Sequence, residues 1–87
     1  MKKLTMFYLE TCPFCKKAFN WMEELKAENP AYKDIAVHLV EETKEKEIAE
    51  QHDYYFVPTY YLGDEKIHEG IATKEKIKAV FDKTLNS

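Results

Sequence analysis

The chain has 87 residues, of which 45% are hydrophobic, and a net charge of −3. This length predicts one domain, residues 1–87, with a single core. Basic and acidic residues alternate and form no basic stripe, which argues against a nucleic-acid partner. The apolar run behind Lys2 and Lys3 ends before Glu10, too short for a signal peptide core or a membrane span. We therefore expect a cytoplasmic monomer with no membrane partner and no cofactor.

The first two predicted elements are a strand and a helix. The strand covers Leu4–Leu9, a mostly apolar run without charge that suits a strand buried on both faces. The helix covers Pro13–Ala27 and ends before Asn29-Pro30. Its core face is predicted from apolar residues at helical spacing: Cys15, Ala18, Phe19, Met22 and Leu25.

The middle of the chain predicts a second strand and a short helix. The strand covers Ile35–Val40, with Ile35, Val37 and Leu39 on one face. The helix covers Lys44–Gln51, where alternating lysine and glutamate form a solvated face.

The last third predicts a β-hairpin and a final helix. Tyr54–Leu62 is strongly β-forming, although Pro58 suits the beginning of a strand better than its interior. Gly63-Asp64 is a turn signal, and the charged segment Glu65–Glu69 suits an edge strand that returns antiparallel. A helix is predicted over Lys74–Leu85.

The predicted order is β-α-β-α-β-β-α. Helical crossovers between the early strands imply parallel pairing, and the late hairpin adds an antiparallel pair. The prediction is an α/β fold with one four-stranded mixed sheet flanked by helices. Ligand sites in such sheets lie beyond the carboxyl ends of strands, and Cys12 follows the first strand there.

Cys12 and Cys15 are the only cysteines of the chain. Pro13 suits the first helical position, which makes Cys12 the predicted N-cap. Free backbone N–H groups and the helix dipole then favour a thiolate at Cys12, and the positive charge of Lys16 is predicted to tune its ionisation further. Cys12 is the candidate nucleophile, and Cys15 is placed to close a disulfide behind it.

Other interpretations of this pair are a structural disulfide, half of a zinc site, or two unrelated core cysteines. A disulfide between residues three apart removes little chain entropy, and the three histidines lack the paired spacing of zinc motifs. A redox pair is favoured, because C-x-x-C in a cytosolic βαβ pattern is typical of one. Two rival functions remain: a carrier of metal or an iron–sulfur cluster through two thiolates, and an interaction module without catalysis.

Two motifs, Thr11-Cys12-Pro13-Phe14-Cys15 and Val57-Pro58-Thr59, resemble the thioredoxin superfamily, and specifically its small glutaredoxin-like and thioredoxin-like proteins. The resemblance implies a thioredoxin-like fold and an enzyme that reduces protein disulfides through its two cysteines. It also implies a cis Val57–Pro58 bond that faces the cysteines. The implied substrate-binding residues are Thr11, Pro13, Phe14, Val57 and Pro58.

The chain departs from the family pattern in three places, two of which bear on the electron donor. Leu9 stands where glutaredoxins usually have a lysine, and Gly70-Ile71-Ala72-Thr73 replaces a Gly-Gly followed by an acidic residue. Those missing groups bind the carboxylates of glutathione, so the resemblance favours a flavoprotein reductase over glutathione. Lys16 and Lys17 flank the same mouth and could supply part of the missing charge. Met6 occupies the place of the buried aspartate of thioredoxins.

Overall fold

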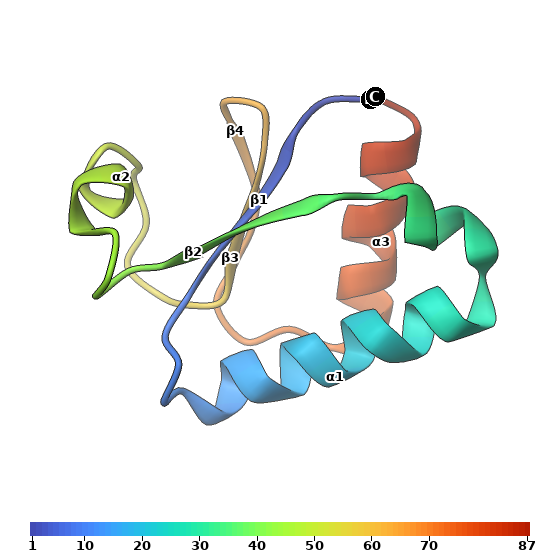
Figure 1. Ribbon diagram of the computed structural model, residues 1–87, viewed down its shortest axis with the longest axis horizontal. Helices are drawn as coiled ribbons and strands as arrows, with labels where there is room; N and C mark the ends of the chain where they lie inside the picture. The colour runs from blue at the N-terminus through green and yellow to red at the C-terminus, as the bar shows by residue number, and fades with distance from the viewer.

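A four-stranded mixed sheet with the strand order β2-β1-β3-β4 forms the centre of the computed structural model, which describes residues 1–87 (Figure 1). β1 (Leu4–Tyr8) is parallel to β2 (Val37–Glu41). β3 (Thr59–Leu62) runs antiparallel to both β1 and β4 (Glu65–Glu69). The predicted mixed sheet is therefore confirmed, with β1 at a central position.

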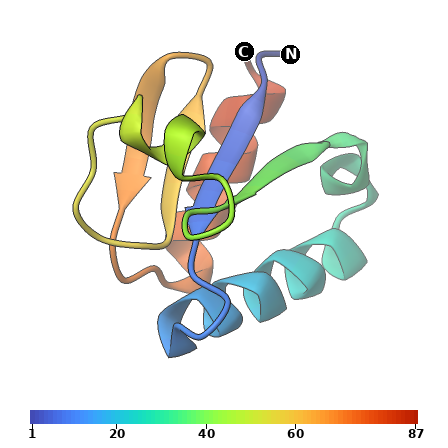
Figure 2. The same cartoon turned by 60° about the vertical axis from the view of Figure 1, so that its left-hand side comes forward.

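Helices cover both faces of this sheet. α1 (Pro13–Glu28) and α3 (Lys74–Leu85) pack against each other on one face, whereas α2 (Lys46–Glu50) lies on the opposite face (Figure 2). A 3₁₀ turn, η1 (Pro30–Asp34), connects α1 to β2. None of the helices has the length and apolar character needed to cross a membrane.

Two hydrophobic clusters, one on each face, hold the layers together. Successive strand residues point to opposite faces, so Met6 of β1 faces α1 and α3, whereas Phe7 faces α2. The smaller cluster consists of Phe7, Val40 and Tyr61. The larger cluster has thirteen buried residues: Leu4, Met6, Ala18, Met22, Leu25, Tyr32, Ile35, Tyr60, Leu62, Ala72, Ile77, Val80 and Phe81.

The structure corrects the predicted bounds of the third strand. β3 begins at Thr59, and the β-forming residues of 54–57 lie outside the sheet. Thr59 pairs with Phe7, near the point where β1 ends and the chain turns toward α1. Residues 54–57 therefore have no neighbouring strand to pair with, and their β propensity alone does not make them a strand.

The second strand and α2 also differ from prediction. β2 runs from Val37 to Glu41, and Ile35 instead caps η1. Leu39, predicted to share a face with Ile35 and Val37, is 44% exposed, because β2 is an edge strand that the helices leave uncovered there. α2 is shorter than predicted, whereas β4 and α3 have the predicted bounds.

Candidate functional site

Cys12 is the N-cap of α1 and lies beyond the carboxyl end of β1. Its backbone is extended, its N–H donates to the Leu9 carbonyl at 3.1 Å, and its carbonyl accepts from the N–H groups of Cys15 and Lys16, each at 3.1 Å. Pro13 occupies the first helical turn, where no acceptor for an N–H exists. The Cys12 side chain makes no capping hydrogen bond to the N–H groups of the first turn.

The two thiols occupy different environments. Cys12 is half-buried, whereas Cys15 is 1% exposed. Burial raises the pKa of Cys15 to about 12; a hydrogen bond to the Cys12 sulfur and the nearby Glu42 carboxylate act in the same direction, and the Leu9 backbone N–H opposes them. Cys15 therefore keeps its proton at neutral pH, and Cys12 is the accessible thiol of the pair.

The other predicted site residues around Cys12 are all at the surface. Thr11, Pro13, Phe14 and Lys16 are exposed around Cys12. Lys16 lies in the first turn of α1 and makes no ion pair, so no carboxylate neutralises its charge there. These residues form the rim of the site.

The segment before β3 contributes the second predicted motif. The Val57–Pro58 peptide bond is cis, as the resemblance implied. Pro58 is buried, and its carbonyl accepts from the Gly70 N–H at 2.9 Å. Val57 is half-buried, and its backbone N–H and carbonyl make no hydrogen bond within the protein.

An apolar groove of about 460 Å³ joins the two motifs. Phe14 from the first motif and Val57 from the second line it together with Phe56, Gly70 and Ile71. Phe56 is 68% exposed and Ile71 is 61% exposed, which is unusual for large apolar side chains in one patch. The sequence analysis missed Phe56 and Ile71; their positions next to Val57-Pro58 and to Gly70 were the available signal.

A second pocket, of about 530 Å³, does not include either cysteine. Leu9, Glu42, Glu50 and Tyr54 are among its lining residues. The Tyr54 hydroxyl donates to Glu42 at 2.7 Å, and burial together with this carboxylate raises the pKa of Tyr54. Two carboxylates, Glu42 and Glu50, and one cation, Lys46, line this pocket, so its lining has no excess of positive charge to attract an anion.

Glu41 is a buried carboxylate that the sequence analysis did not assign to the site. It accepts hydrogen bonds from the backbone N–H of Glu10 at 2.9 Å and from Thr43, whose N–H and hydroxyl are both at 2.6 Å. These bonds, with that of Thr43 first, lower the pKa of Glu41 to about 2. Glu41 thus fixes the turn that leads into Cys12.

No group of three or more histidine, cysteine, aspartate or glutamate side chains is placed to share a metal ion. A metal or cluster at this site would depend on the two thiolates of the pair, with further ligands from another molecule. The geometry suits thiol chemistry without requiring such a partner.

No family model and no curated protein matches the sequence. Solved structures do match. The thioredoxin of Malassezia sympodialis (Mala s 13) is 20% identical with a TM-score of 0.72, covering 94% of this chain and 73% of its own. Oxidised thioredoxin from Plasmodium falciparum is 20% identical with a TM-score of 0.69, covering 92% and 77%. An uncharacterised thioredoxin-like protein from Clostridium perfringens is 22% identical with a TM-score of 0.68, covering 97% and 71%.

These neighbours agree with the fold that the two motifs implied. At 20–22% identity the similarity establishes the fold alone. The close pair of cysteines is a separate observation, made on this chain. The protein has the thioredoxin-like fold, and the two cysteines of its own C-x-x-C sequence, Cys12 and Cys15, lie close together at the start of α1.

Proposed function

We propose that the protein is a cytoplasmic dithiol–disulfide oxidoreductase that reduces disulfide bonds in other proteins. The observation that carries this proposal is the asymmetry of the two thiols. Cys12 is accessible at a helix N-terminus, whereas Cys15 is buried, protonated and in contact with the Cys12 sulfur. The thioredoxin-like fold supports the same chemistry.

The reaction has two exchange steps. The Cys12 thiolate attacks one sulfur of the substrate disulfide; a mixed disulfide forms, and the other substrate sulfur leaves as a thiolate. Cys15 then gives up its proton to solvent or to that thiolate and attacks the Cys12 sulfur. The mixed disulfide breaks, the second substrate thiol leaves, and a Cys12–Cys15 disulfide remains. The substrate gains two electrons, which the dithiol loses.

The groove and the Val57 backbone provide a docking place for the substrate chain. An extended segment could pair with the free N–H and carbonyl of Val57 as an added strand. Its apolar side chains would then lie against Phe14 and Ile71 in the groove. Substrates with apolar residues beside the disulfide suit this surface best.

The Cys12–Cys15 disulfide must be reduced again, and we propose a flavoprotein reductase as the donor. Glutathione carries two carboxylates, and charge-assisted contacts to such groups contribute about 1.5–3 kcal/mol each. The pocket that Leu9 lines has one cation, Lys46, against two carboxylates, Glu42 and Glu50. Its net charge therefore does not favour the two carboxylates of glutathione.

A coupled assay tests the proposed function. The protein is given a protein disulfide substrate and NADPH with a thioredoxin-reductase-type flavoenzyme, and release of substrate thiols is followed. Sustained release that disappears in Cys12→Ser is expected. Absence of release, with retention of about one metal ion or cluster per protein or dimer after anaerobic purification, would favour the carrier function instead.

A further inference from the structure

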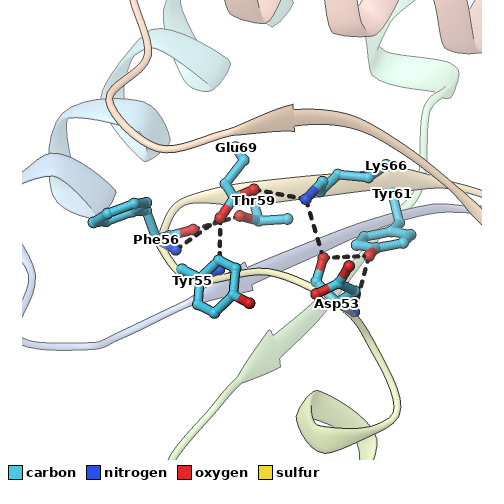
Figure 3. A network of polar contacts seen from close by, with 7 residues as sticks. All are labelled: Asp53, Tyr55, Phe56, Thr59, Tyr61, Lys66 and Glu69. Carbon is cyan, nitrogen blue, oxygen red and sulfur yellow. Dashed lines mark hydrogen bonds and ion pairs between the residues drawn. The ribbon is translucent and has the colours of Figure 1, made fainter.

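A network of polar contacts ties β4 to residues 53–56, the segment just before the cis peptide bond (Figure 3). Oε2 of Glu69 accepts the backbone N–H of Tyr55 at 2.5 Å and that of Phe56 at 3.0 Å. Its other oxygen, Oε1, accepts from Lys66 Nζ at 2.7 Å. One carboxylate thus holds two consecutive backbone groups of the segment.

The same network fixes both ends of the segment. At the start, the carbonyl of Asp53 accepts from Lys66 Nζ at 3.1 Å and from the Tyr61 hydroxyl at 2.8 Å. At the end, the Thr59 hydroxyl donates to the Phe56 carbonyl at 2.5 Å. Figure 3 shows the Glu69 carboxylate between Lys66 and the Tyr55–Phe56 backbone.

Burial does not explain why the segment is held this way. Tyr55 is 85% exposed and Phe56 is 68% exposed, so burial of these two rings contributes little free energy to the observed conformation of the segment. A flexible segment with these rings would collapse onto the nearest apolar surface. The bonds to Glu69 hold the backbone so that Phe56 instead lines the groove with Phe14 and Ile71.

The Glu69 carboxylate is ionised when it makes these bonds. The hydrogen bond from Lys66, followed by those from Tyr55 and Phe56, lowers the pKa of Glu69 to about 2. Glu69 is therefore ionised at neutral pH, and its bonds to the segment are charge-assisted.

We propose that Glu69 is a positioning residue for substrate selection: by holding the Tyr55–Phe56 backbone it keeps the apolar groove formed, and so favours disulfides that are flanked by bulky apolar side chains. This inference rests on the proposed function. When the groove is already formed, substrate binding does not have to order the segment, and the conformational entropy cost of binding is smaller. The effect is therefore on KM, and the exchange chemistry at Cys12 is unchanged.

The test compares two peptide disulfides that differ at one position, phenylalanine or serine beside the cysteine, together with hydroxyethyl disulfide as a substrate too small to fill the groove. For Glu69→Ala we expect KM for the phenylalanine peptide to rise roughly tenfold, with kcat retained. The rates with the serine peptide and with hydroxyethyl disulfide should change less than about twofold.

Glu65→Ala is the matched control, because Glu65 is on the same strand and its only ion pair is the 3.8 Å contact with Lys83. It should leave all three substrates unaffected. Glu69→Gln keeps an oxygen acceptor for the backbone N–H groups. Its KM for the phenylalanine peptide should therefore lie between those of the unmodified protein and Glu69→Ala. Should Glu69→Ala fail to fold by circular dichroism, Lys66→Met removes the cation of the network and Phe56→Ala removes the ring itself; either should raise KM for the phenylalanine peptide selectively.

Equal effects of Glu69→Ala on all three substrates, or no effect on the phenylalanine peptide, would overturn the inference. Both outcomes are distinct from failure of the proposed function, in which the unmodified protein would reduce none of the three disulfides.

Discussion

The carboxylate of Glu41 accepts the backbone N–H of Glu10 at 2.9 Å, which ties the end of β2 to the turn that leads into Cys12. Glu41 is 6% exposed and also accepts from the N–H and hydroxyl of Thr43. A buried carboxylate with this many donors holds the turn only in its ionised form. An ionised carboxylate therefore holds the turn that leads into Cys12.

The ionised state of Glu41 predicts how the free energy of unfolding depends on pH. The pKa of Glu41 is lowered from 4.5 to about 2 in the folded protein, so its ionised form stabilises the fold above pH 4.5. The contribution is lost as the pH falls from 4.5 toward 2. Glu41→Gln should be less stable than the unmodified protein at pH 7, and the difference should shrink toward pH 2.

Urea unfolding at pH 7, 4 and 2.5 measures this. Glu10→Gln is a suitable control, because it keeps the backbone N–H that Glu41 accepts and changes only the exposed side chain, which pairs with Lys44. A constant difference between Glu41→Gln and the unmodified protein at all three pH values would contradict the role assigned to the ionised carboxylate.

The two thiols should differ in reactivity. Burial raises the pKa of Cys15 well above that of a free thiol, so Cys15 is protonated at pH 7, and its sulfur is also shielded from reagents. Under brief iodoacetamide treatment, Cys12 should be modified at least about 100 times faster than Cys15. Mass spectrometry of proteolytic peptides gives both rates in one sample, and equal rates would show that the asymmetry does not exist in solution.

The electron donor should depend on Leu9. Glutathione with glutathione reductase should support turnover poorly, and a thioredoxin-reductase-type enzyme should support it well. Leu9→Lys adds a cation to the pocket that Glu42 and Glu50 line and should raise the rate with glutathione about tenfold. Leu9→Met is the control, because it changes shape without charge. Efficient glutathione-dependent turnover by the unmodified protein would mean that other groups bind its carboxylates.

Much of the fold could be predicted because local patterns and tertiary packing agree. In α1, Pro13 marked the first helical turn, and Cys15, Ala18 and Met22 are buried as their spacing indicated. The bounds of β4 and α3 were also correct, since the Gly63 turn and the Thr73 cap are short-range signals.

What could not be predicted depends on partners that are distant in sequence. Residues 54–57 have strong β propensity, but β1 ends too early to pair with them. Glu41 and Glu69 look like wet surface residues in the sequence. They are functional candidates only because the fold brings backbone N–H groups of Glu10, Tyr55 and Phe56 to them.

The central claim is that Cys12 attacks substrate and Cys15 resolves the mixed disulfide. Its most direct measurement is trapping: Cys15→Ser, Cys12→Ser and the double variant are incubated with a protein disulfide substrate, and covalent complexes are separated without reductant. Cys15→Ser should accumulate a mixed disulfide through Cys12 that dithiothreitol releases, and the other two variants should form none. Accumulation in Cys12→Ser at a rate equal to that of Cys15→Ser would contradict the assigned roles, because it would make the buried thiol an equal nucleophile.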